Sequence, residues 1–209
     1  MTDIGQATDT NARTDTGTNA GMDTGMDAGM DAGTNTATGS NTRHAIVETS
    51  LGGLTVVASD GAITGLYFPH HWYLPSEQSL GRRVDVQDDT LLTLAATQLA
   101  EYLDGDRTTF DLPTRTNGDA FQERVWAMLR EIPFGETTTY GELAERLGNK
   151  ALAQSVGQAV GHNPLSIIVA CHRVVGSNGK LTGFAGGLKR KQRLLEIEEP
   201  ETVKEARLF

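Results

Sequence analysis

The sequence predicts an α/β (α+β) fold, in which a small N-terminal antiparallel sheet with a helix precedes a mainly helical C-terminal domain with a helix-turn-helix. Three observations predict it. Short apolar stretches punctuated by Gly-Gly and Asp-Gly occupy residues 45–68, apolar residues at helical spacing dominate from residue 119, and Pro and Gly cluster at 112–118. The chain has 209 residues, 38% hydrophobic and 22% charged, which suffices for one ordinary domain or two small ones.

The first 42 residues differ in composition from all that follows. They are almost entirely Thr, Asp, Gly, Ala, Asn and Met, with the repeat GMDTGMDAGMDAG at 21–33. The Met residues recur every four positions, as on one side of a helix, but a Gly in each repeat costs roughly 1 kcal/mol against Ala. Because so little apolar surface is available for burial, we expect a disordered low-complexity tail at 1–42. We then predict an N-terminal domain at 43–115, a C-terminal domain at 116–199 and a tail at 200–209.

The N-terminal domain is expected to contain three short strands joined by tight turns, and one helix. Apolar residues at helical spacing run from Thr90 to Asp104 and end at Gly105, a residue typical of a helix C-terminus. The pair His70-His71 could suggest a metal site. Because adjacent side chains diverge and no Cys or further His lies nearby in the sequence, we favour an ordinary loop.

The C-terminal domain carries two helix start signals of the capping-box type, Asp119 with Gln122 and Thr139 with Glu142. The second helix ends near Gly148, and a further helix follows after a short turn. Two short helices joined by a Gly-containing turn are the helix-turn-helix pattern, although an ordinary helical hairpin gives the same pattern. If DNA is the partner, the second helix and its N-terminal turn should face it.

Charge and cysteine content restrict the class of protein. The net charge of −9 is carried by residues 1–42 (−5) and 43–115 (−5), whereas residues 116–209 carry +1, so the last third is the part that could approach phosphate. A single cysteine cannot form an internal disulfide, and no basic start with an apolar stretch indicates secretion. The nearest approach to a long apolar run, Leu165 to Ala170, is far too short for a membrane helix. We expect a soluble cytoplasmic protein with no membrane partner.

The lone thiol, Cys171, follows an apolar stretch and precedes a His-Arg pair. We expect Ser166 to Ala170 to form a short buried strand whose end holds Cys171, with the chain turning outward at His172. A buried cysteine of purely structural role is one interpretation. The other is a reactive thiol, because a nearby base or cation increases the fraction of nucleophilic thiolate.

A glycine-rich loop at 182–187 and a basic helix starting at Leu188 and ending near Glu198 complete the domain. The glycines would allow close approach to a flat ligand, or the segment could simply be a flexible loop. We expect the basic side chains of the helix to form a solvated face, and contact with phosphate is the second interpretation. These side chains are Lys189, Arg190, Lys191 and Arg193.

Two stretches resemble a known family: FQERVWAMLREIPFGETTTYGELAERLGN, and NPLSIIVACHRVVGSNGKLTGFAGGLKRKQRLLEIE, which contains Cys171. They look like the methylated-DNA protein-cysteine methyltransferases, the O6-alkylguanine-DNA alkyltransferases, and the similarity covers about Arg43 to Glu198. The resemblance implies a ribonuclease H-like N-terminal domain. It also implies direct repair of double-stranded DNA by a monomer without metal or organic cofactor, in which an alkyl group on O6 of guanine, or on O4 of thymine, moves to Cys171 after base flipping.

The same resemblance assigns the site residues. Cys171 is the nucleophile and methyl acceptor, His172 the base acting through a water, and Glu198 the group that orients His172. Asn163 matches a hinge residue, and Tyr140 matches a proton donor to guanine. The base pocket is expected to be lined by Val174, Phe184, Ala185 and Gly186. The expected DNA contacts are Gln154 at the position of the inserted finger, Ser155, Gly157, Thr139 and Arg173.

Two positions depart from the family pattern. Ala170 stands where a proline usually precedes the cysteine, which loosens the backbone but removes no chemical group. Gln154 stands where an arginine usually replaces the flipped base in the duplex, and it lacks the cation. We therefore expect weaker, more salt-sensitive or slower base extrusion than in relatives with arginine.

Three other functions remain open. A lesion-binding protein without repair activity would lack the cysteine that this chain has as Cys171. A helix-turn-helix regulator that uses a methylated cysteine as a signal would need an additional DNA-binding domain, which the sequence does not indicate. A cysteine hydrolase could use Cys171, His172 and Glu198 on an acyl substrate, and it would turn over repeatedly.

Overall fold

The computed structural model describes residues 41–199, which belong to one compact unit. The two tails expected from the sequence lie outside the described residues, except for residues 41 and 42. Buried apolar side chains from both halves of the described chain form one continuous cluster. The two expected domains therefore share a core.

The N-terminal half contains a four-stranded sheet in the order β3-β2-β1-β4. Its strands are β1 (Arg43–Val47), β2 (Leu54–Ser59), β3 (Ala62–Tyr67) and β4 (Arg82–Arg83). The first three pair antiparallel as expected, and the Asp-Gly turn between β2 and β3 has positive φ at both Asp60 and Gly61, which suits a tight hairpin. β4 pairs parallel to β1, so the sheet is mixed rather than purely antiparallel. A strand of two residues is too short to show an alternating pattern of apolar and polar residues, so the sequence does not predict it.

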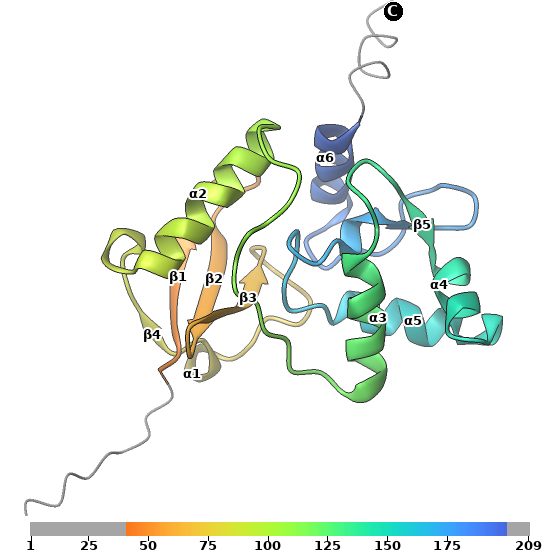
Figure 1. The fold of residues 1–209 in the computed structure, drawn as a ribbon, viewed down its shortest axis with the longest axis horizontal. Coiled ribbons are helices and arrows are strands. Elements are labelled where there is room, and N and C mark those ends of the chain that lie inside the picture. The colour runs from red at the N-terminus through yellow and green to blue at the C-terminus, as the bar shows by residue number, and fades with distance from the viewer. Residues whose placement is uncertain (1–40, 200–209) are drawn as a thin grey trace, which may run out of the picture. The chain divides into compact units, whose positions relative to one another are not determined.

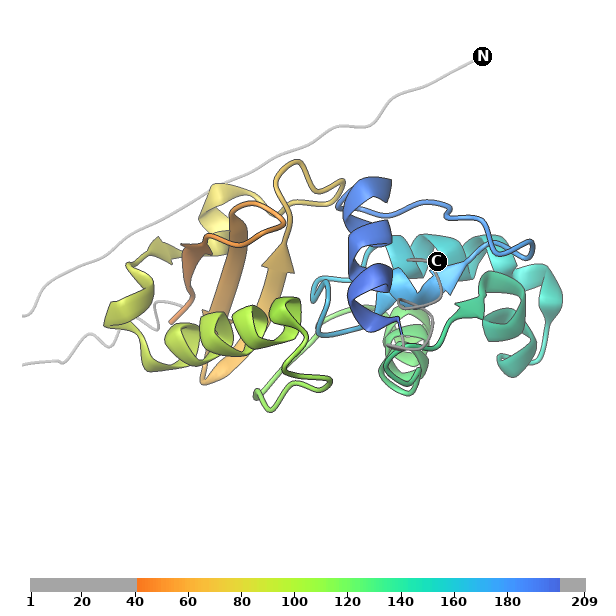
Figure 2. The ribbon, with the colours of Figure 1, turned by 90° about the horizontal axis from the view of Figure 1, so that it is seen from above.

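A single long helix, α2 (Thr90–Asp104), covers the sheet, as Figures 1 and 2 show. The Asp89 side chain accepts hydrogen bonds from two backbone amides at its start, and Gly105 ends it with φ of 88°. Both ends match the sequence prediction. Two short helical segments lie between the sheet and this helix: α1 (Glu77–Leu80) and η1 (Val86–Asp88).

The C-terminal half is mainly helical. Its helices are α3 (Ala120–Arg130), α4 (Tyr140–Arg146), α5 (Ala153–Gly161) and α6 (Leu188–Glu198), with the short turns η2 (Lys150–Leu152) and η3 (Cys171–Arg173). A two-stranded parallel ladder joins β5 (Thr138–Thr139) to β6 (Val174–Val175). Both predicted capping boxes are formed, at Asp119 and at Thr139. The pair α4 and α5, joined through η2, has the predicted helix-turn-helix order.

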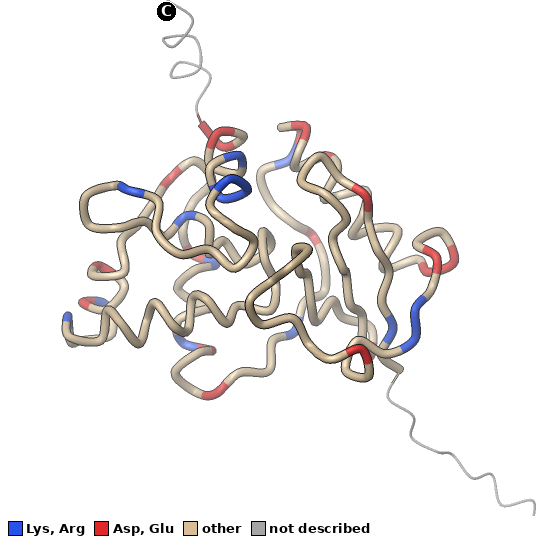
Figure 3. The backbone as a smooth tube through the Cα atoms, turned by 180° about the vertical axis from the view of Figure 1, so that it is seen from behind, with Lys and Arg blue, Asp and Glu red and all other residues tan. Residues whose placement is uncertain are grey.

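Helix α6 lies between the sheet half and the other helices of the C-terminal half in both ribbon views (Figures 1 and 2). It contacts α2 on one side and η3 on the other. Figure 3 shows Lys and Arg in the first part of this helix and Glu toward its end. Side chains from α2 and from η3 can therefore meet on α6.

The segment before Cys171 is not the strand that the sequence predicted. Residues 165–169 form a tight turn closed by the Val169 amide, which donates to the Leu165 carbonyl at 2.8 Å, and Ile167 has φ of 72°. Isolated bridges connect Leu165 to Leu66 and Ser166 to Val169. The prediction was wrong because an apolar run shows only that a segment is buried, and this buried turn has the same composition as a buried strand.

Candidate active site

Cys171 begins η3 and is buried, with 5% of its surface exposed. Its backbone amide donates to the Val169 carbonyl at 2.7 Å. The same carbonyl accepts from the Asn163 side chain at 2.8 Å, while the other end of that amide accepts from the Leu165 backbone at 3.0 Å. Asn163 is itself buried and thus fixes both ends of the turn that delivers the thiol.

His172 is completely buried, which corrects the expectation that the chain turns outward there. Its Nε2 lies 2.7 Å from Oε1 of Glu198. Because a carboxylate can only accept, Nε2 carries the proton of the neutral ring and Nδ1 carries a lone pair. Within residues 41–199, Nδ1 of His172 is the one buried side-chain polar atom without a hydrogen-bond partner. The ring is therefore oriented with a free basic nitrogen.

Glu198, at the end of α6, receives hydrogen bonds from several directions. Arg173 donates from Nε at 2.8 Å and from Nη2 at 2.9 Å, the Gly135 amide donates at 3.1 Å, and the Tyr102 hydroxyl also donates. Burial alone would raise the pKa of Glu198, but the hydrogen bonds from His172 and Arg173 bring the pKa down to about 2. Glu198 is therefore a fixed negative charge next to Nε2 of His172.

Arg173 is buried inside the protein, although the sequence analysis expected it to contact DNA. Its guanidinium is buried against Glu198, donates to the Ile132 carbonyl at 2.6 Å and lies over the Phe134 ring. Three of its five N–H donors are already used inside the protein and the side chain is buried, so the structure does not support the predicted contact with DNA. This contact could not be predicted from the sequence, because Arg173 and Glu198 are 25 residues apart.

The ionisation of the thiol and of the imidazole sets the resting state. Burial raises the pKa of the Cys171 thiol, against the opposing effects of the Asn163 side chain and the Lys191 charge. Burial also lowers the pKa of His172, although its hydrogen bond to Glu198 acts in the opposite direction. The resting pair is a neutral thiol and a neutral imidazole, so the nucleophile must lose its proton to a base as it reacts.

Two residues of the site were missed from the sequence. Tyr102 of α2 was counted with the apolar stripe of that helix, yet its hydroxyl reaches Glu198 and lies 3.3 Å from Nε2 of His172. Lys191 was placed on a solvated face, yet it is fully buried, and burial lowers its pKa to about 8. A signal for Lys191 existed, because it precedes Glu198 by seven residues and so shares its face of the helix.

Lys191 holds the glycine-rich loop. Its Nζ donates to the Thr182 carbonyl at 2.9 Å, and to the carbonyls of Val174 and Gly183. Arg190 likewise donates to the Leu51 and Gly186 carbonyls, at 2.8 and 2.9 Å, and so is not a free surface cation. The loop is fastened to α6 by both residues, which disfavours the alternative of a merely flexible loop.

Cys171 opens into a cavity of about 390 Å³. The lining is mainly apolar or glycine and comes from several elements: Trp72, Tyr140, Ala153, Gln154, Gly157, Val160, Gly161, Cys171, Thr182, Gly183, Phe184 and Ala185. Phe184 and Ala185 line it as expected. Val174 and Gly186 do not: Val174 is buried as the carbonyl partner of Lys191, and a Cβ on Gly186 would lie 2.4 Å from Phe68. These two support the wall of the cavity from behind.

Of the other predicted residues, Tyr140, Gln154 and Gly157 line this cavity, whereas Ser155 and Thr139 do not. Tyr140 is half-buried, packs against Gly157 and donates from its hydroxyl to the Thr182 carbonyl at 3.5 Å. Burial is the main cause that raises the pKa of Tyr140, so its proton is retained at neutral pH. Gln154 is exposed at the start of α5 and lines the cavity, and Ser155 beside it is exposed. Thr139 caps α4.

Comparison with known proteins identifies the family. Two family models match in succession: the ribonuclease-like domain of 6-O-methylguanine DNA methyltransferase over residues 42–116, and its DNA binding domain over residues 120–200. The chain belongs to this family. A methylated-DNA–protein-cysteine methyltransferase of Mycolicibacterium paratuberculosis is 41% identical over 163 residues, which cover 78% of this chain and 96% of that protein.

A crystal structure of the Mycobacterium tuberculosis methyltransferase OGT in complex with DNA superposes with a TM-score of 0.67 at 40% identity. It covers 75% of this chain and 92% of that chain. A further crystal structure of the M. tuberculosis O6-methylguanine methyltransferase has a TM-score of 0.68 at 39% identity, and it covers 76% of this chain and 93% of that chain. The family and fold class predicted from the sequence are confirmed.

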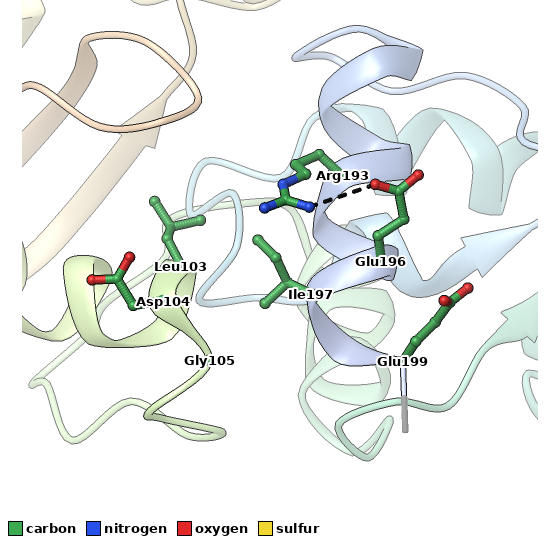
Figure 4. Close-up of a pocket in the computed structure, with 7 residues that line it drawn as sticks. All are labelled: Leu103, Asp104, Gly105, Arg193, Glu196, Ile197 and Glu199. Atoms are coloured by element: carbon green, nitrogen blue, oxygen red, sulfur yellow. Dashed lines mark ion pairs between the residues drawn. The ribbon is translucent and has the colours of Figure 1, made fainter. Parts of the chain in front are cut away.

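Two further features lie outside the cavity that holds the thiol. A hollow of about 380 Å³ lies between the end of α2 and α6, where Arg193 pairs with Glu196 at 3.7 Å (Figure 4). His71 is buried, and its Nε2 lies 3.4 Å from the Ser166 hydroxyl. Within residues 41–199, no three His, Cys, Asp or Glu side chains are grouped as metal ligands. No helix in the described part of the chain has the length and apolar character to cross a membrane.

Proposed function

We propose that this chain removes the alkyl group from O6-alkylguanine in double-stranded DNA and transfers it irreversibly to its own Cys171. The observation that carries the proposal is the position of Cys171 at a mainly apolar cavity, followed in the chain by a buried His172 whose tautomer is fixed by Glu198. The relatives' name and the DNA complex of the similar M. tuberculosis enzyme support it.

The reaction needs a thiolate at the moment of attack. The proton of Cys171 passes, through one water, to Nδ1 of His172, the buried nitrogen with no protein partner. The imidazolium that forms is stabilised by the adjacent Glu198 carboxylate, whose low pKa keeps it charged. Tyr102 and Arg173 hold that carboxylate in place. Cys171 therefore becomes a nucleophilic thiolate when His172 accepts its proton.

The alkyl transfer itself is a displacement at carbon. A bond forms between Sγ of Cys171 and the alkyl carbon, while the bond between that carbon and O6 breaks and its electron pair stays on the guanine. Tyr140 at the cavity donates a proton to the guanine ring, which leaves as ordinary guanine. The Tyr140 phenolate then regains a proton as the His172 imidazolium releases one to solvent, so the net change is the exchange of the thiol proton for the alkyl group. Protonation makes the leaving group better, and the soft sulfur is suited to attack on saturated carbon.

The product cannot be recycled within the chain. A thioether is inert, and the sequence has no second cysteine that could accept the group. Each molecule therefore acts once. The same displacement would remove an alkyl group from O4 of thymine, which presents an equivalent bond.

The guanine must leave the base stack to reach a thiol at this depth. The mouth of the cavity lies beside the start of α5, where Gln154 and Ser155 are exposed. We assign Gln154 to the gap left in the duplex and the α4–α5 pair to DNA contact, with one chain acting as a monomer. Asn163 joins this DNA-facing helix to the turn that carries Cys171.

Incubation with a duplex oligonucleotide containing one O6-methylguanine, followed by peptide mass analysis, tests the proposal. We expect one methyl group on the peptide containing Cys171, in a yield that never exceeds one per chain, and none in Cys171→Ser. An unmodified Cys171 peptide would refute the proposal. Repeated turnover of a chromogenic ester by the unaltered chain, abolished in Cys171→Ser, would instead favour a cysteine hydrolase.

A further inference from the structure

An exposed tryptophan from the N-terminal half reaches the cavity of the C-terminal half. Trp72 has 61% of its surface exposed, although large aromatic side chains are usually buried. It nevertheless lines the same cavity as Cys171. The family resemblance assigns this residue no role, and the residues around Trp72 show no helical or strand period in the sequence.

The loop that carries Trp72 is a defined turn. The His71 amide donates to the Phe68 carbonyl at 3.2 Å, and the Leu74 amide donates to the His71 carbonyl at 3.3 Å. His70 has φ of 61°, a left-handed conformation that reverses the chain. Trp72 therefore occupies the outer position of a tight turn.

Both neighbours of Trp72 contact the C-terminal half. His71 points inward to the Ser166 hydroxyl at 3.4 Å, in the turn that precedes Cys171. Tyr73 stacks on His162 at the end of α5, with ring centroids 3.6 Å apart and planes inclined by 23°. A residue fixed on both sides has lost most of its backbone freedom before any ligand arrives. The contacts of His71 and Tyr73 therefore fix the backbone position of Trp72.

The indole lies over the glycine-rich loop. A Cβ placed on Gly183 would be 3.8 Å from the six-membered ring of Trp72, so the ring lies close to a backbone position that has no side chain. Phe184 and Tyr140 are the other aromatic residues of this cavity. Aromatic rings lining an apolar cavity favour stacked or edge contacts with an aromatic ligand.

We propose that Trp72 is a specificity-determining residue that stacks on the aryl part of a bulky O6 substituent. This contact raises the rate at which arylmethyl groups are transferred, relative to the rate for methyl. This inference rests on the proposed alkyl transfer to Cys171. A methyl group on the guanine offers no aromatic surface to the indole, whereas an arylmethyl group brings a ring into the cavity that both Cys171 and Trp72 line. The contact adds binding energy for one substrate class only, which is how discrimination arises.

The test compares duplexes that differ only in the O6 substituent of one guanine: methyl, benzyl or cyclohexylmethyl. Single-turnover rates are measured for the unaltered chain and for Trp72→Ala, Trp72→Phe and Leu74→Ala. We expect the ratio of benzyl to methyl rates to fall about tenfold in Trp72→Ala, and the cyclohexylmethyl to methyl ratio to fall less. Trp72→Phe should recover most of the benzyl ratio.

Leu74→Ala is the matched control, because Leu74 lies on the same loop, is also exposed and does not line the cavity. Its rate ratios should equal those of the unaltered chain. The inference is overturned if the unaltered chain transfers methyl but not benzyl, or if the benzyl ratio in Trp72→Ala is unchanged or higher. Equal losses for benzyl and cyclohexylmethyl would also overturn it. Failure of the unaltered chain to transfer even methyl would refute the proposed function itself.

Discussion

Lys191 Nζ donates to the Thr182 carbonyl at 2.9 Å and thereby fastens helix α6 to the loop that walls the cavity. The same ammonium donates to the Val174 carbonyl behind Cys171. One buried cation thus connects the helix that carries Glu198, the glycine-rich loop and the segment that follows the thiol. A charge this deeply buried is costly unless several acceptors surround it, and here the loop supplies them.

Replacing Lys191 by Met should reduce both stability and alkyl transfer. The carbonyls of Val174 and Thr182 lose their donor, so we expect the free energy of unfolding to fall by about 2 kcal/mol. The Lys191 charge also lowers the pKa of the Cys171 thiol, so its removal should slow methyl transfer roughly tenfold. Urea denaturation and single-turnover kinetics measure the two effects. Lys189→Met, at an exposed position of the same helix, should change neither by a comparable amount.

The hydroxyl of Tyr102 should matter more for reaction than for folding. Tyr102→Phe keeps the ring against Phe110 and removes the hydroxyl, which donates to Glu198 and lies near Nε2 of His172, so unfolding should cost about 1 kcal/mol less than in the unaltered chain. Because Glu198 fixes the His172 tautomer, we expect slower methyl transfer, with the largest loss at the low end of the pH profile. An unchanged rate across the profile would show that Tyr102 only fills space.

Glu198 makes stability depend on pH in the acid range. Its folded-state pKa of about 2 lies below the ordinary value of 4.5, so its contribution is complete above pH 4.5 and is lost as the pH falls through 2. The shift corresponds to about 3 kcal/mol. Urea titrations between pH 5 and 2 should show this loss, and Glu198→Gln should reduce the slope while lowering stability at pH 7. An equal slope in both proteins would contradict the assignment.

Local signals in the sequence predicted most of the elements, and long-range packing determined what they missed. Asp119 with Gln122, Thr139 with Glu142, and Gly105 each mark a helix end through contacts within a few residues, so these ends were predictable. Tyr102 meets Glu198 across 96 residues, and no neighbour in the sequence announces that contact. The turn at 165–169 was predicted as a strand because burial, not backbone pairing, made it apolar.

Gln154 offers a test of how the guanine is extruded. It is exposed at the start of α5 and lines the cavity mouth, the position from which a side chain could fill the gap in the duplex. Gln154→Arg adds a cation there, so we expect faster methyl transfer on duplex DNA and little change on single-stranded DNA, which needs no extrusion. Ser155→Arg is the control for charge alone, because Ser155 is exposed next to Gln154 and does not line the cavity. It should tighten DNA binding in a salt-dependent manner without the same gain in rate. Equal duplex rates for Gln154→Arg and the unaltered chain would mean that the missing cation does not limit extrusion.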